Sequence, residues 1–459
     1  MTSKLGRPTM SRPHDNDPRS TTLLPYELTA IADLKPAERN ARKHSKSQVA
    51  ALARSLSEFG MVSPVIIDAH NRILAGHGRV EAAKKLGETT VPTLRVDLTD
   101  GKARLYALAD NRIAEQSAWD EEARSEEFRE LRIEIPELDL TLSGFEHPEI
   151  EWAIASLEQT DWSDLDWADE DEAGEPVTRV GDLWEFPSGH SLGCGDSSDP
   201  STVAVVVGDD QVRLVEEDFP YNLKAKEYSG KGRHRHGDFQ MAGGEMSASE
   251  FPSFLARSFA AIKPHLVDGA LLYGFMDWKH IRDLLDAGER SEFELKNLVV
   301  WDKGKGGMGA LYRSAHELIA VFKHGAAPHV NNVMLGKHGR DRHNVWRYAG
   351  MNRFGAGRDR ALALHATVKP VEMICDLMLD ASRPGDVVFD GFCGSGTTLI
   401  AAEKLGRRAR TIELDPHYCD VAIERFKRAF GEEPFERRTG LTFSGLAAQR
   451  TDGGTGTNG

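Results

Sequence analysis

The feature that most constrains the fold is a glycine-rich turn between an apolar strand and a helix. Residues 387–390 form an apolar run typical of a buried strand, residues 391–398 read Gly-Phe-Cys-Gly-Ser-Gly-Thr-Thr, and residues 399–405 predict a helix. A second strand is predicted at 409–414 and carries Glu413 near its end. This order is the layout of a nucleotide-binding half-fold, in which glycines let the backbone approach a ligand and the acid accepts hydrogen bonds from ribose hydroxyls. The sequence therefore predicts an α/β protein.

Composition excludes several classes of protein. The 459 residues are 40% hydrophobic and 28% charged, which is ordinary for a chain of two or three folded domains. No apolar run approaches the roughly 18 residues of a membrane span, and the polar N-terminus has no apolar signal core, so we expect no membrane partner and a cytoplasmic location. Four cysteines without CxxC spacing argue against a disulfide scaffold or a zinc site, and we expect no metal.

Charge is distributed unevenly along the chain. The net charge of -15 argues against a nonspecific nucleic-acid binder, but residues 158–175 hold nine acidic residues and no basic one. This stretch predicts a solvated acidic linker; the alternative is an intramolecular DNA mimic that covers a basic surface. Residues 337–360 hold seven Lys or Arg against two Asp, so a DNA-facing surface can exist within an acidic total.

The N-terminal part predicts a disordered segment over 1–21 and a small α/β module over 22–120. Ser45 or Ser47 can cap a helix that Gly60 ends, strands are expected at 65–67, 73–75 and 93–96, and a turn at 76–79 leads into a helix at 80–86. The module resembles the ParB-like N-terminal domain, on the segments Ser63-Pro64-Val65-Ile66, Leu74-Ala75-Gly76-His77-Gly78-Arg79 and Ala109-Asp110-Asn111-Arg112.

The resemblance raises the question of nucleotide binding by this module. In relatives a Gly-x-x-Arg turn at the start of a helix can hold phosphates. Relatives that bind CTP usually have two arginines where this chain has Gly78-Arg79, so nucleotide binding is not our expectation. We expect instead a turn that packs the module and positions it on DNA or on another protomer, and a homodimer stays open.

The glycine turn itself separates two classes of nucleotide-dependent enzyme. Its pattern is F-x-G-x-G-T, with Thr398 where a dehydrogenase has a third glycine, so it suits a ligand without a pyrophosphate. Together with the upstream His365-Ala-Thr-Val-Lys-Pro run, residues 365–425 closely resemble the permuted amino-methylating DNA methyltransferases, which have a Rossmann-like catalytic domain. The resemblance implies S-adenosyl-L-methionine as cofactor, held by Asp196, His365, Thr367, Lys369, Asp390, Phe392, Gly394, Gly396, Thr397 and Glu413.

The predicted strand at 212–215 leads into Asp218-Phe219-Pro220-Tyr221, which resembles the D-P-P-Y catalytic loop of that family. The amine of a nucleobase is a poor nucleophile, and a carboxylate and a backbone carbonyl that accept its two N–H groups aim its lone pair at the methyl donor. Pro220 stiffens the loop, and the Tyr221 ring offers a face on which a flipped base stacks. The chain departs from the pattern at Phe219 and at Glu216-Glu217, two acids that we expect to raise the pKa of Asp218 or to repel DNA.

The order of the motifs, catalytic loop before cofactor turn, resembles the β group of amino-methyltransferases. A D-P-P-Y-like loop in this order favours adenine N6, because cytosine N4 enzymes of this resemblance more often begin the loop with serine. Stretches at 301–318 and 344–348 resemble a prophage-type branch in which the ParB-like module is fused in front. We expect contacts to double-stranded DNA from basic residues in the loops. They are Lys224, Lys226, Lys231, Arg233, Arg235, Arg313, Lys337, Arg340, Arg342 and Arg347.

The predicted organisation is completed by a helical segment and acidic linker over 121–176, a methyltransferase domain over 177–437 and a disordered tail over 438–459. One alternative is a DNA-binding ParB-like regulatory protein with a degenerate methylase domain, which the altered 216–219 segment keeps open. A methyltransferase of small molecules or proteins would have no use for the basic loops.

Overall fold

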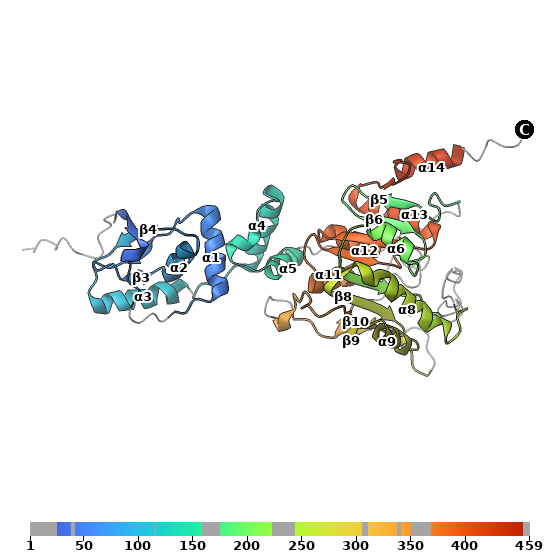
Figure 1. Cartoon of the computed structure of the whole chain (residues 1–459), viewed down its shortest axis with the longest axis horizontal. Helices are drawn as coiled ribbons and strands as arrows, with labels where there is room; N and C mark the ends of the chain where they lie inside the picture. Colours follow the sequence, from blue (N-terminus) through green and yellow to red (C-terminus); the bar gives the residue numbers. More distant parts are fainter. Residues whose placement is uncertain are drawn as a thin grey trace, which may run out of the picture. The chain divides into compact units, whose positions relative to one another are not determined.

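The computed structural model describes residues 25–37, 42–114, 116–157, 175–222, 244–304, 311–336, 341–349 and 369–452. The chain divides into two compact units, Met1–Ile154 and Ala155–Gly459 (Figure 1). The predictions of a disordered segment at 1–21 and of an acidic linker beyond residue 157 fall outside the described residues.

The first unit contains a four-stranded sheet in the order β1-β4-β2-β3. Ser45 caps helix α1 by accepting a hydrogen bond from the backbone N–H of Gln48, and Gly60 ends the helix. Gly76 has a left-handed backbone (φ +96°), so helix α2 begins at His77 and not at residue 80 as predicted. The elements are β1 Tyr26–Ala30, α1 Lys46–Phe59, β2 Val65–Ile67, β3 Ile73–Ala75, α2 His77–Lys85, β4 Thr90–Arg95 and α3 Asp100–Ala114.

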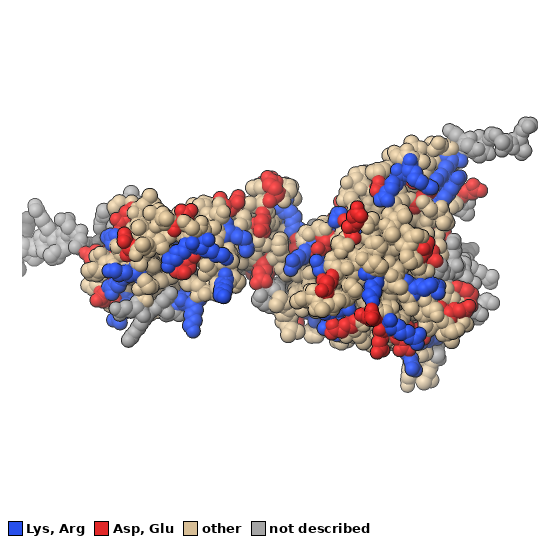
Figure 2. All heavy atoms as spheres, in the orientation of Figure 1, with Lys and Arg blue, Asp and Glu red and all other residues tan. Residues whose placement is uncertain are grey.

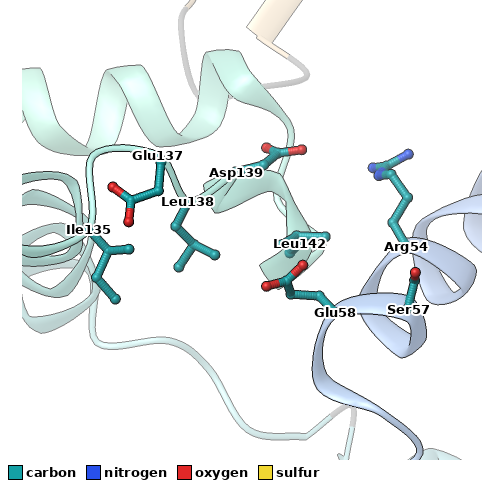
Figure 3. Close-up of a pocket in the computed structure, with 8 residues that line it drawn as sticks. All are labelled: Arg54, Ser57, Glu58, Ile135, Glu137, Leu138, Asp139 and Leu142. Carbon is teal, nitrogen blue, oxygen red and sulfur yellow. The ribbon is translucent and has the colours of Figure 1, made fainter.

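The helical segment predicted after residue 120 lies largely within this first unit, which ends at Ile154. Its elements are α4 Glu121–Glu134, the 3-10 helix η2 Leu140–Ser143 and α5 His147–Leu157. Phe128 and Ile150 are buried in a small core of this segment, and α1 packs against η2. Between α1 and the chain that enters η2 lies a pocket of about 460 Å³ with a mixed charged and apolar lining (Figure 3). The segment is therefore packed against helix α1 of the first unit.

The second unit is built on a ten-stranded sheet in the order β11-β9-β10-β8-β7-β12-β13-β6-β5-β14. The five central strands β8, β7, β12, β13 and β6 are parallel to one another. Strand β10 runs antiparallel beside β8, and β5 runs antiparallel beside β6. The strands are β5 Leu183–Glu185, β6 Ser191–Cys194, β7 Val212–Asp218, β8 Leu266–Met276, β9 Glu294–Asp302, β10 His316–Lys323, β11 Val345–Arg347, β12 Val387–Asp390, β13 Arg408–Glu413 and β14 Phe435–Glu436.

Helices cover both faces of this sheet, so the Rossmann-like prediction is confirmed. Two separate cores lie between the layers. On one side pack α6 Pro200–Val207, α8 Glu250–Ile262 and α9 Ile281–Arg290, and on the other α11 Val371–Ala381, α12 Thr397–Lys404 and α13 Pro416–Phe430.

Strand β7 supplies both cores, because successive side chains of a strand point to opposite faces. Leu214 is buried in the α11–α12 core, and Val215 and Phe219 are buried in the α8 core. The alternation therefore turns Glu216 and Asp218 toward the α11–α12 layer and Glu217 toward the α8 layer.

The predicted disorder of 438–459 is wrong for residues 438–452. Helix α14 Phe443–Asp452 places Phe443 and Leu446 in the α11–α12 core, with the Phe443 ring edge-on to Trp184. Arg438 and Arg450 both form ion pairs with the buried Asp182. The helical spacing of Phe443 and Leu446 could have predicted this helix, but the Gly- and Thr-rich composition of the tail favoured a prediction of disorder. None of the helices in the described part of the chain is long and apolar enough to cross a membrane.

Candidate active site

Four acidic residues line the carboxyl edge of the parallel strands. Asp218 ends β7, Asp390 ends β12, Glu413 ends β13, and Asp196 lies two residues after β6. These strands are neighbours in this order, so the four side chains follow one another along a single edge. Ligands of open α/β sheets bind beyond the carboxyl ends of the strands. The sequence motifs at 196, 218, 390 and 413 thus meet at one site.

The glycine turn fits a ligand that approaches its backbone. Gly394 and Gly396 have left-handed φ values of +54° and +85°. A Cβ atom on Gly396 would lie 2.9 Å from the Ala422 Cβ, so this glycine allows the turn to pack on α13. A Cβ on Gly394 would meet only the Phe392 carbonyl oxygen, at 3.9 Å, so the space above Gly394 is open. The turn can therefore accommodate the group that the motif predicts.

Glu413 is held beside this open space by backbone donors. Its Oε2 accepts a hydrogen bond from the Gly394 N–H at 2.8 Å, and its Oε1 accepts one from the Asp415 N–H at 2.8 Å. Burial raises the pKa of Glu413 to about 7. The Oδ1 of Asp196 accepts a hydrogen bond from the Ser198 N–H at 2.8 Å. Both carboxyl groups are partly exposed and can receive donors from a ligand.

The catalytic loop is organised around Asp218 by a buried lysine. The Lys369 Nζ lies 2.5 Å from the Asp218 Oδ2 and 3.6 Å from the Glu317 Oε2. The Tyr221 hydroxyl lies 3.1 Å from the Asp218 Oδ1 and 2.9 Å from the Glu317 Oε2, and Lys303 forms an ion pair with Glu317. We call Asp218, Tyr221, Lys303, Glu317 and Lys369 the charge network. Lys369, which the sequence assigned to the cofactor, directs its ammonium group at the catalytic loop.

Sequence reasoning missed Glu317 and Lys303 as site residues. Glu317 is the second residue of β10, and Lys303 follows the end of β9. Both strand ends lie at the edge where β8 ends, since Leu318 pairs with Met276 and His316 pairs with Asp302. The sequence signal was the resemblance of 301–318 to methyltransferase stretches, but only the strand pairing brings it to Asp218.

Phe219 occupies the position where the D-P-P-Y pattern has its first proline. Its side chain is 1% exposed and packs against the rings of Phe259 and Phe392, with centroid distances of 5.9 and 5.3 Å. The ring thus belongs to the α8 core, and only the backbone of Phe219 remains for the site. Asn222 closes the loop, because its side-chain oxygen accepts hydrogen bonds from the Gly244 and Met246 N–H groups.

The two extra acids before Asp218 point into the protein. The Glu216 Oε2 accepts a hydrogen bond from the Thr398 hydroxyl at 2.8 Å, and the Glu217 Oε2 accepts one from the Gly391 N–H at 3.2 Å. Both residues are at most 3% exposed, so the expected repulsion of DNA is wrong. Burial and Asp390 raise the pKa of both groups well above the ordinary value, which favours the neutral form. The pKa of Asp218 is raised, but by burial first and by Glu317, against the lowering effect of Lys369.

Two other predicted cofactor residues have partners within the protein. The Asp390 Oδ1 accepts a hydrogen bond from the Phe392 N–H at 2.9 Å, and burial raises the pKa of Asp390 to about 6. The Thr397 hydroxyl donates to the backbone carbonyl of Lys369 at 3.4 Å and so joins the start of α12 to the lysine. His365 and Thr367 lie outside the described residues.

The predicted DNA-contacting residues divide into three groups. Arg342 is used internally, because its guanidinium pairs with Asp376 and Asp380 at 2.8 and 3.0 Å and lies 4.8 Å above the Trp346 ring. Its assignment to phosphates is therefore wrong. Arg313 and Arg347 are exposed. On the visible face of the second unit, basic and acidic side chains are interspersed (Figure 2). The remaining predictions fall outside the described residues: Lys224, Lys226, Lys231, Arg233, Arg235, Lys337 and Arg340.

In the first unit, Arg79 supports the expectation of a turn that packs the module. Its Nη2 donates a hydrogen bond to the Pro64 carbonyl at 3.0 Å and lies 3.0 Å from where a Cβ on Gly76 would be. The guanidinium therefore joins the turn before α2 to the segment that enters β2.

Comparisons with known families agree with both halves of this description. The ParB N-terminal domain family matches residues 16–112, and the DNA methylase family matches residues 212–424. The chain joins a ParB N-terminal domain to a DNA methylase domain of the N6/N4 family. Both resemblances inferred from the sequence are confirmed, and the residues that match the DNA methylase family include Asp218, Asp390 and Glu413.

Individual relatives cover parts of the chain. It is 46% identical over 71 residues to the ParB-like nuclease domain-containing protein YnaK of Escherichia coli K12, covering 15% of this chain and 82% of that protein. It is 43% identical over 63 residues to the type II methyltransferase M.HinfI of Haemophilus influenzae, spanning 14% of this chain and only 18% of that relative. The crystal structure of the M1.HpyAVI–SAM complex is similar with 18% identity and a TM-score of 0.36, over 51% of this chain and 97% of that one.

Proposed function

We propose that the chain is an S-adenosyl-L-methionine-dependent DNA methyltransferase that methylates the exocyclic amine of a flipped base, adenine N6 in preference to cytosine N4. The observation that carries this proposal is the position of Asp218. It ends β7 beside the strand that leads into the glycine turn, and it exposes 21% of its side chain at the edge of the sheet. A base amine at that edge is within reach of both the carboxylate and a ligand on the turn.

The cofactor supplies an electrophilic methyl group when it is bound. Glu413 would accept hydrogen bonds from its ribose hydroxyls, and Asp196 would accept one from its adenine amino group. The open space above Gly394 leaves room for the ligand against the backbone. The other cofactor residues expected from the sequence, among them Phe392 and Thr397, remain part of this proposal, except Lys369, whose ammonium group pairs with Asp218 and Glu317.

The loop residues orient the amine. Asp218 and the Phe219 carbonyl accept its two N–H groups, which directs the nitrogen lone pair away from the ring system and toward the methyl donor. The buried Phe219 ring anchors the backbone that presents this carbonyl. The Tyr221 ring provides a stacking face for a base taken out of the duplex. Most of the rate enhancement should come from this positioning in a site that excludes water.

Double-stranded DNA is the proposed partner. Arg313 precedes Glu317 by four residues, and Arg347 ends β11, so both exposed cations lie on segments that lead to or from the same sheet edge. The preference for adenine depends on the aspartate that opens the catalytic loop, because cytosine N4 enzymes of this resemblance more often have serine there.

The test is transfer of tritium from labelled S-adenosylmethionine to duplex DNA by the purified full-length chain, with nucleoside analysis of the product. We expect N6-methyladenine from the wild type and no transfer by Asp218→Ala, with cofactor affinity unchanged by calorimetry. Glu424→Ala, on the exposed face of α13, is the matched control and should keep activity. Transfer by Asp218→Ala would contradict the mechanism, N4-methylcytosine would reverse the base assignment, and a wild type that binds DNA without transfer would indicate a regulatory protein.

A further inference from the structure

The charge network contains more than the catalytic loop needs for its shape. Asp218, Glu317 and Lys369 meet at the Tyr221 hydroxyl, and Lys303 forms an ion pair with Glu317, so two carboxylates and two ammonium groups come together from four separate segments of the chain. Their formal charges sum to zero. The Lys369 and Glu317 side chains are 5% and 9% exposed, whereas Asp218 is 21% and Lys303 is 27% exposed, so Asp218 is the carboxylate of the network that a substrate can reach.

Lys369 is held in one place by aromatic rings as well as by carboxylates. Its Nζ lies 5.2 Å from the Phe275 ring centroid, 5.7 Å from that of Tyr221 and 5.8 Å from that of Trp301. Ring faces stabilise a desolvated cation. Burial works against the charge, but Asp218 and Glu317 raise the pKa of Lys369, so the ammonium form persists in this position.

We propose that Lys369 is a positioning residue that keeps the Asp218 carboxylate ionised and aimed at the target amine, and that Glu317 and Lys303 fix Lys369 and Tyr221 for this purpose. The inference rests on the proposed function and deepens it. Each Asp218 oxygen has one partner in the network, Lys369 for Oδ2 and the Tyr221 hydroxyl for Oδ1. A carboxylate oxygen has a second acceptor site, so either one can still receive an amine N–H.

The ionised state matters because of the proton balance of the reaction. The amine nitrogen bonds to the methyl carbon as the carbon–sulfur bond breaks, the positive charge passes to nitrogen, and one N–H proton must then leave. An ionised Asp218 already accepts that N–H and can take the proton, whereas a protonated Asp218 would be a donor. A carboxyl group desolvated without a cationic partner tends to remain protonated.

The groups that face Asp218 come from every neighbouring element. Lys369 precedes α11, Glu317 lies on β10, and Tyr221 is on the same loop. Glu216 on β7 and Asp390 on β12 are also close enough to influence it. Burial of Glu216 favours its neutral form. Lys369 is the cation directly paired with Asp218 and lowers its pKa, and Glu317 is the principal negative charge that raises it.

A direct titration tests the inference without relying on activity. Aspartate labelled at the carboxyl carbon gives an Asp218 NMR signal that is identified by its loss in Asp218→Asn. We expect Lys369→Met to raise the apparent pKa of Asp218 by about 1–3 units, Lys369→Arg to preserve it, and Glu317→Gln to lower it. A merely structural role would not move the titration in opposite directions in these variants.

The kinetic arm uses single-turnover methyl transfer at a series of pH values. The acidic limb of the Lys369→Met rate profile should move to higher pH by the same amount, with cofactor affinity unchanged. The inference would be overturned if the Asp218 titration were unshifted in both Lys369→Met and Glu317→Gln. It would also be overturned if Lys369→Met lost cofactor affinity while its Asp218 titration stayed unshifted. If Lys369→Met does not fold, Lys369→Gln replaces it as the neutral variant, and its Asp218 titration decides the sign. A wild type that transfers no methyl group would refute the proposed function, while the titration would still decide the role of Lys369.

Discussion

Cofactor binding should depend on pH through Glu413. Burial raises the pKa of this carboxyl to about 7, yet ribose hydroxyls require it as an ionised acceptor. With that pKa, about one tenth of the group is ionised at pH 6 and about nine tenths at pH 8. If only the ionised form binds, the affinity for S-adenosylmethionine should rise roughly tenfold from pH 6 to pH 8, which corresponds to about 1.4 kcal/mol.

Isothermal titration calorimetry in buffers with different ionisation enthalpies measures both parts of this prediction. At pH 6 the binding of one cofactor should release about 0.9 proton, and at pH 8 about 0.1. Glu413→Gln should bind more weakly and lose the pH dependence, because an amide cannot ionise. Glu424→Gln, a surface change on α13, should retain it.

An affinity that is constant between pH 6 and pH 8, or proton uptake on binding, would refute this prediction. A Glu413→Gln variant with the wild-type pH profile would show that another group controls the dependence. Asp390 is the obvious alternative, since the pKa of its carboxyl is raised to about 6. Asp390→Asn distinguishes the two, because the expected midpoints differ by about one unit.

Three further predictions concern stability and DNA contact. Because the folded state raises the pKa of Glu413 from its ordinary value of 4.5 to about 7, the neutral carboxyl stabilises the ligand-free chain at pH values below 4.5, and this contribution is lost as pH rises through about 7. In urea unfolding, the free energy of unfolding of the wild type should fall by at most about 3 kcal/mol between pH 4.5 and pH 8, relative to Glu413→Gln. Arg342→Ala leaves two acidic partners without their cation and should cost about 3 kcal/mol of unfolding free energy, whereas Arg347→Ala should leave stability unchanged and lower the salt slope of DNA binding by about one. Gly396→Ala combines a left-handed φ with a 2.9 Å approach to Ala422 and should lower stability by about 1–3 kcal/mol in thermal melting; an unchanged melting temperature would contradict the packing argument.

Local sequence patterns were sufficient for the elements that carry the motifs. The apolar run before the glycine turn is a strand, Ser45 caps its helix, and the acid predicted at the end of the second strand stands at the end of β13. These features depend on residues within one turn or one strand of each other. Their side chains and backbone preferences are therefore visible in a short stretch of sequence.

Long-range pairing decided what the sequence could not supply. Glu317 reaches Tyr221 across 96 positions, and it does so because β10 runs antiparallel to β8 and begins where β8 ends. Arg342 belonged to a basic stretch that suggested phosphate contact, but α11 provides two aspartates for it. Composition described the charge of that stretch correctly and gave no information on which partner neutralises it.

The three consecutive acids of β7 show how the fold assigns different chemistry to identical functional groups. Glu216 meets a hydroxyl and another carboxyl, and Glu217 meets a backbone N–H, so burial favours the neutral form of both. Asp218 points to the same layer as Glu216, but it lies two residues further along the strand, where Lys369 pairs with it. The alternation of the strand and the placement of one lysine thus distinguish Asp218, the proposed acceptor for the base amine, from its two neighbours. Lys369→Met should therefore make Asp218 resemble its two neighbours, and the carboxyl titration measures whether it does.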